Sequence, residues 1–153
     1  MARLEQLPGA IAKLLSSAPL PQFASTPFAI GPPLDGRRVA ILSTAGLHRR
    51  DDPPFSMDPT DMRVIPGDVA AVDLLMSHGS AHFDRSGFQQ DWNLVFPIDR
   101  LRELAAAGVI GSLADFHYSL VGGVDPAALE GPAALIASRL AADAVDAVLL
   151  VPV

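Results

Sequence analysis

A short apolar run, Arg38-Val39-Ala40-Ile41-Leu42-Ser43, decides the fold. Turn residues bound it on both sides, Asp35-Gly36 before it and Gly46 after it, and its length and flanks are typical of a buried strand. Working outward, apolar runs at residues 70–76, 116–121 and 145–153 predict three more strands. The first of these could also be a short helix.

Two amphipathic segments alternate with the later strands. Pro97 opens one predicted helix, which ends before Gly108, and Pro132 opens another, which ends near Asp143. Strands and helices in this order predict an α/β fold in one domain, with helices packed on a parallel or mostly parallel sheet.

The region before the first strand has a different composition. Residues 4–15 carry leucines and one isoleucine at helical spacing, and residues 18–36 are rich in proline and glycine. We therefore expect an N-terminal helix and connector over residues 1–36, followed by the α/β domain over residues 37–153. After the first strand, a long loop from Arg49 to Asp68 is expected to lack regular structure, and loops of that kind are usually functional or disordered.

The composition excludes several classes of function. No apolar stretch reaches the roughly 18–20 residues that a membrane span needs, and no secretory signal opens the sequence, so we expect a cytoplasmic protein that makes no membrane contact. The net charge is −6 and no block of Lys or Arg occurs, which argues against nucleic-acid binding. The sequence has no cysteine, so disulfides, thiolate metal sites and thiol redox chemistry are excluded within this chain.

Chemically capable side chains crowd into residues 77–91, directly after a predicted strand. The segment holds two imidazoles, two carboxylates, a guanidinium and two amides. Ligands of open parallel sheets bind beyond the carboxyl ends of the strands, so this segment is predicted to be a substrate loop. Arg85 could bind a carboxylate bidentately, while a histidine moves protons. The alternative is a polar loop in which Asp and Ser cap turns and Arg85 pairs with Asp84.

A metal site is a further hypothesis for the same loop. His78, His82 and Asp84 form a two-histidine, one-carboxylate set that suits Fe(II) or Zn(II), although Gly79 disfavours the helix that would align the two histidines. Ordinary hydrogen-bonded histidines are the alternative. His48, which follows the first strand, lies in either a second binding segment or a self-neutralising surface turn.

From about residue 37 onward, six segments occur in a recognisable order: 39–48, 52–55, 82–91, 93–104, 108–112 and 144–153. Together they resemble the selenoprotein B subunits of glycine, sarcosine and betaine reductases, and the related D-proline reductase subunit. The resemblance implies reductive cleavage of a substrate C–N bond by a selenol or thiol nucleophile. In that family the nucleophile, selenocysteine or cysteine, directly follows the strand that matches residues 145–153.

The resemblance therefore implies a selenocysteine or cysteine downstream of this chain or on a partner chain. Either the reading frame ended at a UGA codon for selenocysteine, which the position of the terminus favours, or a short protein has lost the redox group or receives it from a partner. A last strand without its usual cover would leave an apolar open edge. We expect a homodimer, or association with a complementary reductase subunit.

The sequence thus predicts a subunit or truncated form of such a reductase, an oxidoreductase of amino-acid metabolism that binds a small amino-acid-like substrate. The alternatives are a non-redox binding or assembly subunit and a small metal-dependent enzyme. The candidate catalytic residues are His82, Asp84 and Arg85, and the candidate substrate-binding residues are His48, His78, Gln89, Gln90 and Asp91.

Overall fold

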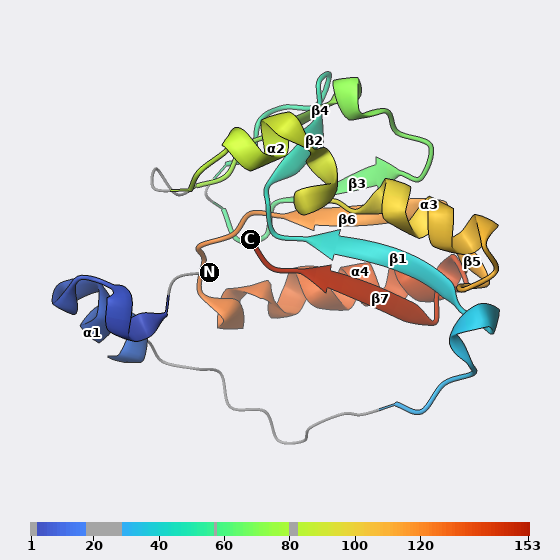
Figure 1. Ribbon diagram of the computed structural model, residues 1–153, viewed down its shortest axis with the longest axis horizontal. Coiled ribbons are helices and arrows are strands. Elements are labelled where there is room, and N and C mark those ends of the chain that lie inside the picture. Colours follow the sequence, from blue (N-terminus) through green and yellow to red (C-terminus); the bar gives the residue numbers. More distant parts are fainter. Residues whose placement is uncertain (1–2, 18–28, 57, 80–82) are drawn as a thin grey trace.

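Strand β1 (Arg38–Ser43) takes part in every parallel pairing of the main sheet. In the computed structural model, β7 (Ala147–Val151) runs parallel to β1 and pairs with all of it except Arg38 (Figure 1). On the other side of β1, β5 (Ser112–Leu113) pairs with its start and β6 (Phe116–Leu120) with its end. The predicted α/β fold is confirmed.

The sheet is mixed because its far strand runs the other way. β3 (Met62–Pro66) pairs antiparallel with β6 along its whole length. Two further strands, β2 (Leu47–Arg49) and β4 (Leu74–Met76), form a small antiparallel sheet of their own. This small sheet lies beyond the end of β1, because β2 begins only four residues after β1 ends.

Side chains alternate across β1 and so contact a different layer on each face. Val39 and Ile41 face a core that holds α3 (Ile98–Ala106) and the small β2–β4 sheet. Ala40 faces the other core, which α4 (Glu130–Ala142) covers. Helices on both faces explain why β1 reads as an almost unbroken apolar run rather than an alternating one.

The structure describes residues 3–17, 29–56, 58–79 and 83–153. Within them, none of the helices is long and apolar enough to cross a lipid bilayer. The remaining helices and 3-10 turns are α1 (Gly9–Ser17), α2 (Ser86–Gln90), η1 (Leu4–Gln6), η2 (Leu34–Gly36), η3 (Ala71–Asp73), η4 (Trp92–Leu94) and η5 (Pro126–Leu129).

The structure refines four local expectations. The loop expected from Arg49 to Asp68 contains strand β3, whose residues pair with β6 despite the proline and aspartate around them. Proline is tolerated at the end of such an edge strand, because the missing N–H is needed least there. Residues 70–76 hold a 3-10 turn followed by β4, and the polar loop 77–91 contains the short helix α2. The N-terminal helix begins at Gly9, because Pro8 separates it from a preceding 3-10 turn.

Candidate functional site

The carboxyl ends of β1 and β7 are joined through Thr44, the residue that follows β1. The main-chain N–H of Thr44 donates to the carbonyl oxygen of Val151 at 3.1 Å. The main-chain N–H of Val153 in turn donates to Thr44 Oγ1 at 2.9 Å. These bonds hold residues 151–153 against the end of the central strand, where ligands of open parallel sheets bind.

A glycine brings the polar loop to this same edge. Gly46 has a φ of +67°, and its carbonyl oxygen accepts the N–H of Ser77 at 2.9 Å. A Cβ atom on Gly46 would lie 2.8 Å from the carbonyl oxygen of Ser77. Only glycine combines this left-handed backbone with so close an approach. The segment that begins at Ser77 is therefore anchored next to the carboxyl end of β1.

His48 is fixed by two hydrogen bonds within this edge. Its Nδ1 atom lies 2.9 Å from the carbonyl oxygen of Arg49, and its Nε2 atom lies 2.9 Å from Ser77 Oγ. A carbonyl can only accept, so Nδ1 carries the proton and the Nε2 atom of the neutral ring accepts the Ser77 hydroxyl proton. The imidazole is only 3% exposed, which explains why its tautomer is set so completely by two partners.

His78 lies beside the end of β7. Its ring stacks on Phe83 with the centroids 4.3 Å apart, and its Nε2 atom lies 3.4 Å from the carbonyl oxygen of Val153. A Cβ atom on Gly122 would lie 3.3 Å from that Nε2 atom and 2.9 Å from the Val153 oxygen. The absence of a side chain at Gly122 therefore leaves the space in which the imidazole and the β7 end meet.

Arg85 connects His78 to a pocket. Its guanidinium donates to the carbonyl oxygen of His78 at 2.8 Å, which uses one of its five N–H donors. The guanidinium also lines a pocket of about 430 Å³ together with His48, Ser77 and Gln89. The structure thus brings His48, predicted in a separate segment, to the same pocket as Arg85 and Gln89 of the loop 77–91. The other lining residues are Pro54, Leu75, Met76 and Phe88.

Other predicted site residues lie elsewhere. Gln90 and Asp91 line a neighbouring pocket of about 390 Å³, into which Gln89 also extends. Asp91 caps η4 by accepting the N–H of Asn93 at 2.9 Å, and hydrogen bonds from Asn93 lower the pKa of its carboxyl group. Asp84 accepts the N–H of Ser86 at 2.9 Å in the same way, and hydrogen bonds from Ser86 lower its pKa.

The proposed metal ligands are only partly described. His82 lies outside the described residues, so its distance from His78 and Asp84 is not defined. Among the residues that the structure describes, no group of three His, Asp or Glu side chains could hold a metal ion. The metal site therefore remains a hypothesis from the sequence.

Sequence reasoning missed Thr44 and Gly122 as parts of this edge. A signal for Thr44 was available, because a hydroxyl residue directly after a buried strand lies at the sheet edge where ligands bind. Gly122 had no comparable signal, since its role depends on a strand that lies more than twenty residues later in the sequence.

Comparisons with known proteins identify the family of this chain. Residues 17–153 match the family model "Glycine/sarcosine/betaine reductase selenoprotein B". The chain is 38% identical over 117 residues to D-proline reductase subunit gamma of Acetoanaerobium sticklandii, an alignment that covers 73% of this chain and 47% of that protein. It is 31% identical over 120 residues to sarcosine reductase complex component B subunit beta of Peptoclostridium acidaminophilum, covering 74% of this chain and 27% of that protein.

A third relative extends the alignment. The chain is 31% identical over 140 residues to glycine reductase complex component B subunit gamma of Symbiobacterium thermophilum, covering 86% of this chain and 32% of that protein. The chain therefore spans less than half the length of these curated relatives. No solved structure gives a significant match to it.

Proposed function

The chain belongs to the glycine/sarcosine/betaine reductase selenoprotein B family, and on that premise we propose that it binds the substrate of a reductive C–N bond cleavage. The observation that carries the proposal is the convergence of His48, Arg85 and Gln89 on one pocket behind the central strand. The names of the relatives point to a small amino acid such as sarcosine, glycine or D-proline as the class of ligand.

The pocket has the chemistry that a small amino acid needs. The N–H donors of Arg85 that bond to no described residue would bind the substrate carboxylate in pairs. The Gln89 amide and the Ser77 hydroxyl add neutral hydrogen-bonding groups, while Phe88 and Met76 supply an apolar wall against the substrate methylene groups. Because His48 is held in one tautomer, its Nε2 atom presents a lone pair toward Ser77 and could accept a proton through that hydroxyl.

We place the family's redox group at the same edge. The resemblance implies a selenol or thiol directly after the strand that β7 corresponds to, and such a group would supply the nucleophile of the C–N cleavage. The chain's own contribution there is His78, whose imidazole lies beside Val153 in the space left by Gly122. An imidazole at that place would hold a proton next to the nucleophile. His82 and Asp84 remain candidates for the same proton transfer.

Calorimetric titration with sarcosine, glycine and D-proline tests the proposal. Arg85→Gln removes the carboxylate partner and should weaken binding about 10- to 100-fold, because a hydrogen bond to a charged group is worth about 1.5–3 kcal/mol. The matched control is Arg100→Gln, which removes the same charge from an exposed pair with Glu103. Unchanged binding by the Arg85 variant would remove this pocket from consideration, and so would the absence of binding for all three compounds.

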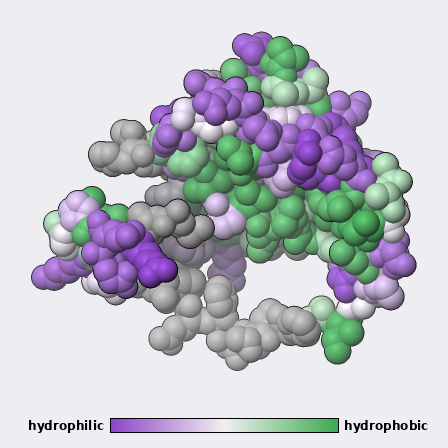
Figure 2. Space-filling model, in the orientation of Figure 1, coloured by the Kyte–Doolittle hydropathy of each residue, from purple (hydrophilic) through white to green (hydrophobic). Residues whose placement is uncertain are grey.

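We also propose that the chain assembles with a complementary reductase subunit. The names of the relatives describe subunits of multi-component complexes. On this chain the outer side of β7 pairs with no other described strand, and three of its apolar side chains are exposed: Val148, Leu149 and Leu150. Figure 2 shows apolar surface where Figure 1 draws β7, below the polar surface of α3. An apolar open strand edge is a surface that a partner chain typically covers.

A further inference from the structure

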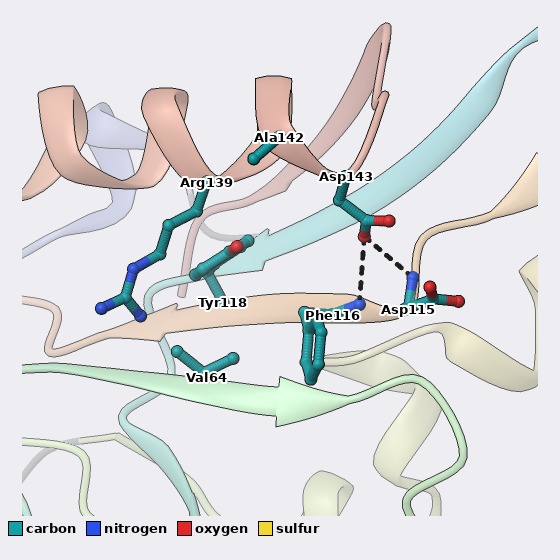
Figure 3. Close-up of a pocket in the computed structure, with 7 residues that line it drawn as sticks. All are labelled: Val64, Asp115, Phe116, Tyr118, Arg139, Ala142 and Asp143. Atoms are coloured by element: carbon teal, nitrogen blue, oxygen red, sulfur yellow. Dashed lines mark hydrogen bonds between the residues drawn. The ribbon is translucent and has the colours of Figure 1, made fainter.

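A third cavity lies on the face of the main sheet that α4 covers, near the start of β6. It has a volume of about 500 Å³ and opens between the last turns of α4 and the start of β6, next to β3 (Figure 3). Phe116, the first residue of β6, lines it, whereas the first site lies beyond the last residue of β1. The proposed substrate site does not extend to this cavity, which therefore requires its own explanation.

Tyr118, a buried residue of β6, lines this cavity. Tyr118 is only 2% exposed and lines the cavity, yet its hydroxyl makes no hydrogen bond with any residue that the structure describes. Burial raises the pKa of this phenol, so the proton stays on the oxygen. The hydroxyl oxygen itself is not fully buried, so a molecule in the cavity can reach it. The Tyr118 hydroxyl is thus a hydrogen-bond donor available to a ligand in the cavity.

A cation stands beside this hydroxyl. Figure 3 shows Tyr118 beneath α4, with Arg139 on one side and Asp143 on the other. Arg139 has no ion pair or hydrogen bond with the described residues, although its positive charge is close enough to act on the Tyr118 phenol. The Tyr118 hydroxyl and the Arg139 guanidinium, two hydrogen-bond donors, therefore belong to residues that line the same cavity.

The acidic groups of the cavity are already engaged. Asp143 accepts hydrogen bonds from Arg38 and from the main-chain N–H groups of Asp115 and Phe116. The Asp115 carboxylate also pairs with Arg38, at 3.1 Å. Arg38 thus pairs with the carboxylates of both Asp115 and Asp143. Among the charged residues that line this cavity, Arg139 is the one without such a described partner and can bind a ligand. Apolar side chains, Val64 and Phe116, make up the wall opposite α4.

We propose that this cavity binds a small carboxylate with an apolar or aromatic body. The carboxylate accepts hydrogen bonds from the Arg139 guanidinium and the Tyr118 hydroxyl, and the body packs between Val64 and Phe116. A phenol and a guanidinium can both donate hydrogen bonds to a carboxylate, and the apolar side chains in the same cavity favour an amphiphilic ligand over inorganic phosphate.

Titration with phenylacetate, followed by NMR of the chain labelled with ¹³C-tyrosine, tests this proposal. Tyr118 is the only tyrosine in the sequence, so the label reports on this cavity alone. We expect saturable shifts of the Tyr118 ring signals on addition of phenylacetate. Arg139→Gln should weaken binding about tenfold or more, since it removes a hydrogen bond to a charged group. Benzyl alcohol, which lacks the charge, should bind more weakly than phenylacetate by a similar factor.

Tyr118→Phe supplies the second arm and is followed by calorimetry. Its hydroxyl bonds no described residue, so the variant should fold with wild-type stability while losing several-fold in phenylacetate affinity. Arg100→Gln is the matched control for charge and should bind phenylacetate like wild type. The proposal is overturned if millimolar phenylacetate leaves the Tyr118 signals unmoved, or if both Arg139→Gln and Tyr118→Phe bind as wild type does. Tighter binding of inorganic phosphate than of phenylacetate would also overturn it. Because the titrated ligand and the variants differ from those used for the Arg85 pocket, failure of one proposal leaves the other intact.

Discussion

The main-chain N–H of Ile41 donates to Nδ1 of His117 at 3.0 Å in the middle of the sheet. The bond occurs where β1 changes partners, since β5 pairs with its start and β6 with its end. Between the two pairings the partner side holds two more residues than β1 does, so the regular ladder is interrupted as at a bulge. The imidazole supplies the acceptor that the interrupted backbone does not.

This bond makes the stability of the fold depend on pH. His117 is completely buried, and burial, reinforced by the positive charges of Arg102 and Arg38, lowers the pKa of its imidazole from 6.5 to about 4. Between pH 6.5 and 4, His117 binds a proton in the unfolded chain but stays neutral in the folded chain. The free energy of unfolding should therefore rise with pH across this window, and about 3 kcal/mol should be lost on acidification. Urea unfolding at several pH values, followed by Trp92 fluorescence, measures this loss.

His117→Gln separates this effect from the titration of other groups. The glutamine amide oxygen can still accept the Ile41 N–H, but it does not titrate. The variant should show a distinctly flatter pH dependence between pH 6.5 and 4 than wild type does. An equal slope in both proteins would assign the acid sensitivity to residues other than His117.

Gly46→Ala tests the close approach that anchors the polar loop. The substitution adds both backbone strain at a φ of +67° and a contact of 2.8 Å with the Ser77 carbonyl oxygen. Gly108 is the matched control, because its φ is +70° and a Cβ atom there meets nothing within 4 Å. We expect Gly108→Ala to cost about 1 kcal/mol and Gly46→Ala clearly more, by about 1–3 kcal/mol. Equal losses in thermal or urea unfolding would show that the loop moves away at little cost.

Ser77→Ala tests the tautomer of His48. The hydroxyl is the partner of His48 Nε2, while Nδ1 remains bound to the Arg49 carbonyl oxygen. Loss of this neutral hydrogen bond should destabilise the chain by about 1 kcal/mol. The ¹⁵N chemical shift of Nε2 should move while that of Nδ1 stays in place. Ser16→Ala, at an exposed helix end, should change neither quantity.

Leu150→Lys tests the assembly surface on β7. Leu150 is 65% exposed, so a charge there should leave the fold intact while it blocks association through the strand edge. Light scattering should show a larger species for wild type, alone or with a complementary subunit, and a monomer for the variant. Val72→Lys, at a position 70% exposed and far from β7 in sequence, is the control. A wild-type chain that stays monomeric under all these conditions would contradict the proposal.

The sequence predicted the elements whose pattern is local. The run at residues 38–43 is β1 to the residue, and Pro97 and Gly108 bracket α3 as helix-boundary residues should. It did not predict β3, because Met62–Pro66 gains its strand conformation from pairing with β6, which lies fifty residues later in the sequence. Local signals favour loop there, and a tertiary contact overrides them.

The candidate site was predictable as a set of residue types but not as a set of neighbours. The density of polar groups in residues 77–91 indicated the loop that lines the pocket. The division of Gln89, Gln90 and Asp91 between two pockets depends on the short helix α2, which turns successive side chains in different directions. Tyr118 gave no signal at all, since an aromatic residue in an apolar strand reads simply as core.

The pairing of β1 with β7 also has a consequence for how the chain folds. Thr44 and Val153 are 109 residues apart, and the central strand has no parallel neighbour on that side until β7 has been synthesised. Contacts so distant in sequence close slowly, and β1 is strongly apolar. During translation the β7 side of β1 would stay unpaired until residues 147–151 have been synthesised, so we expect β1 to be a segment where a chaperone binds.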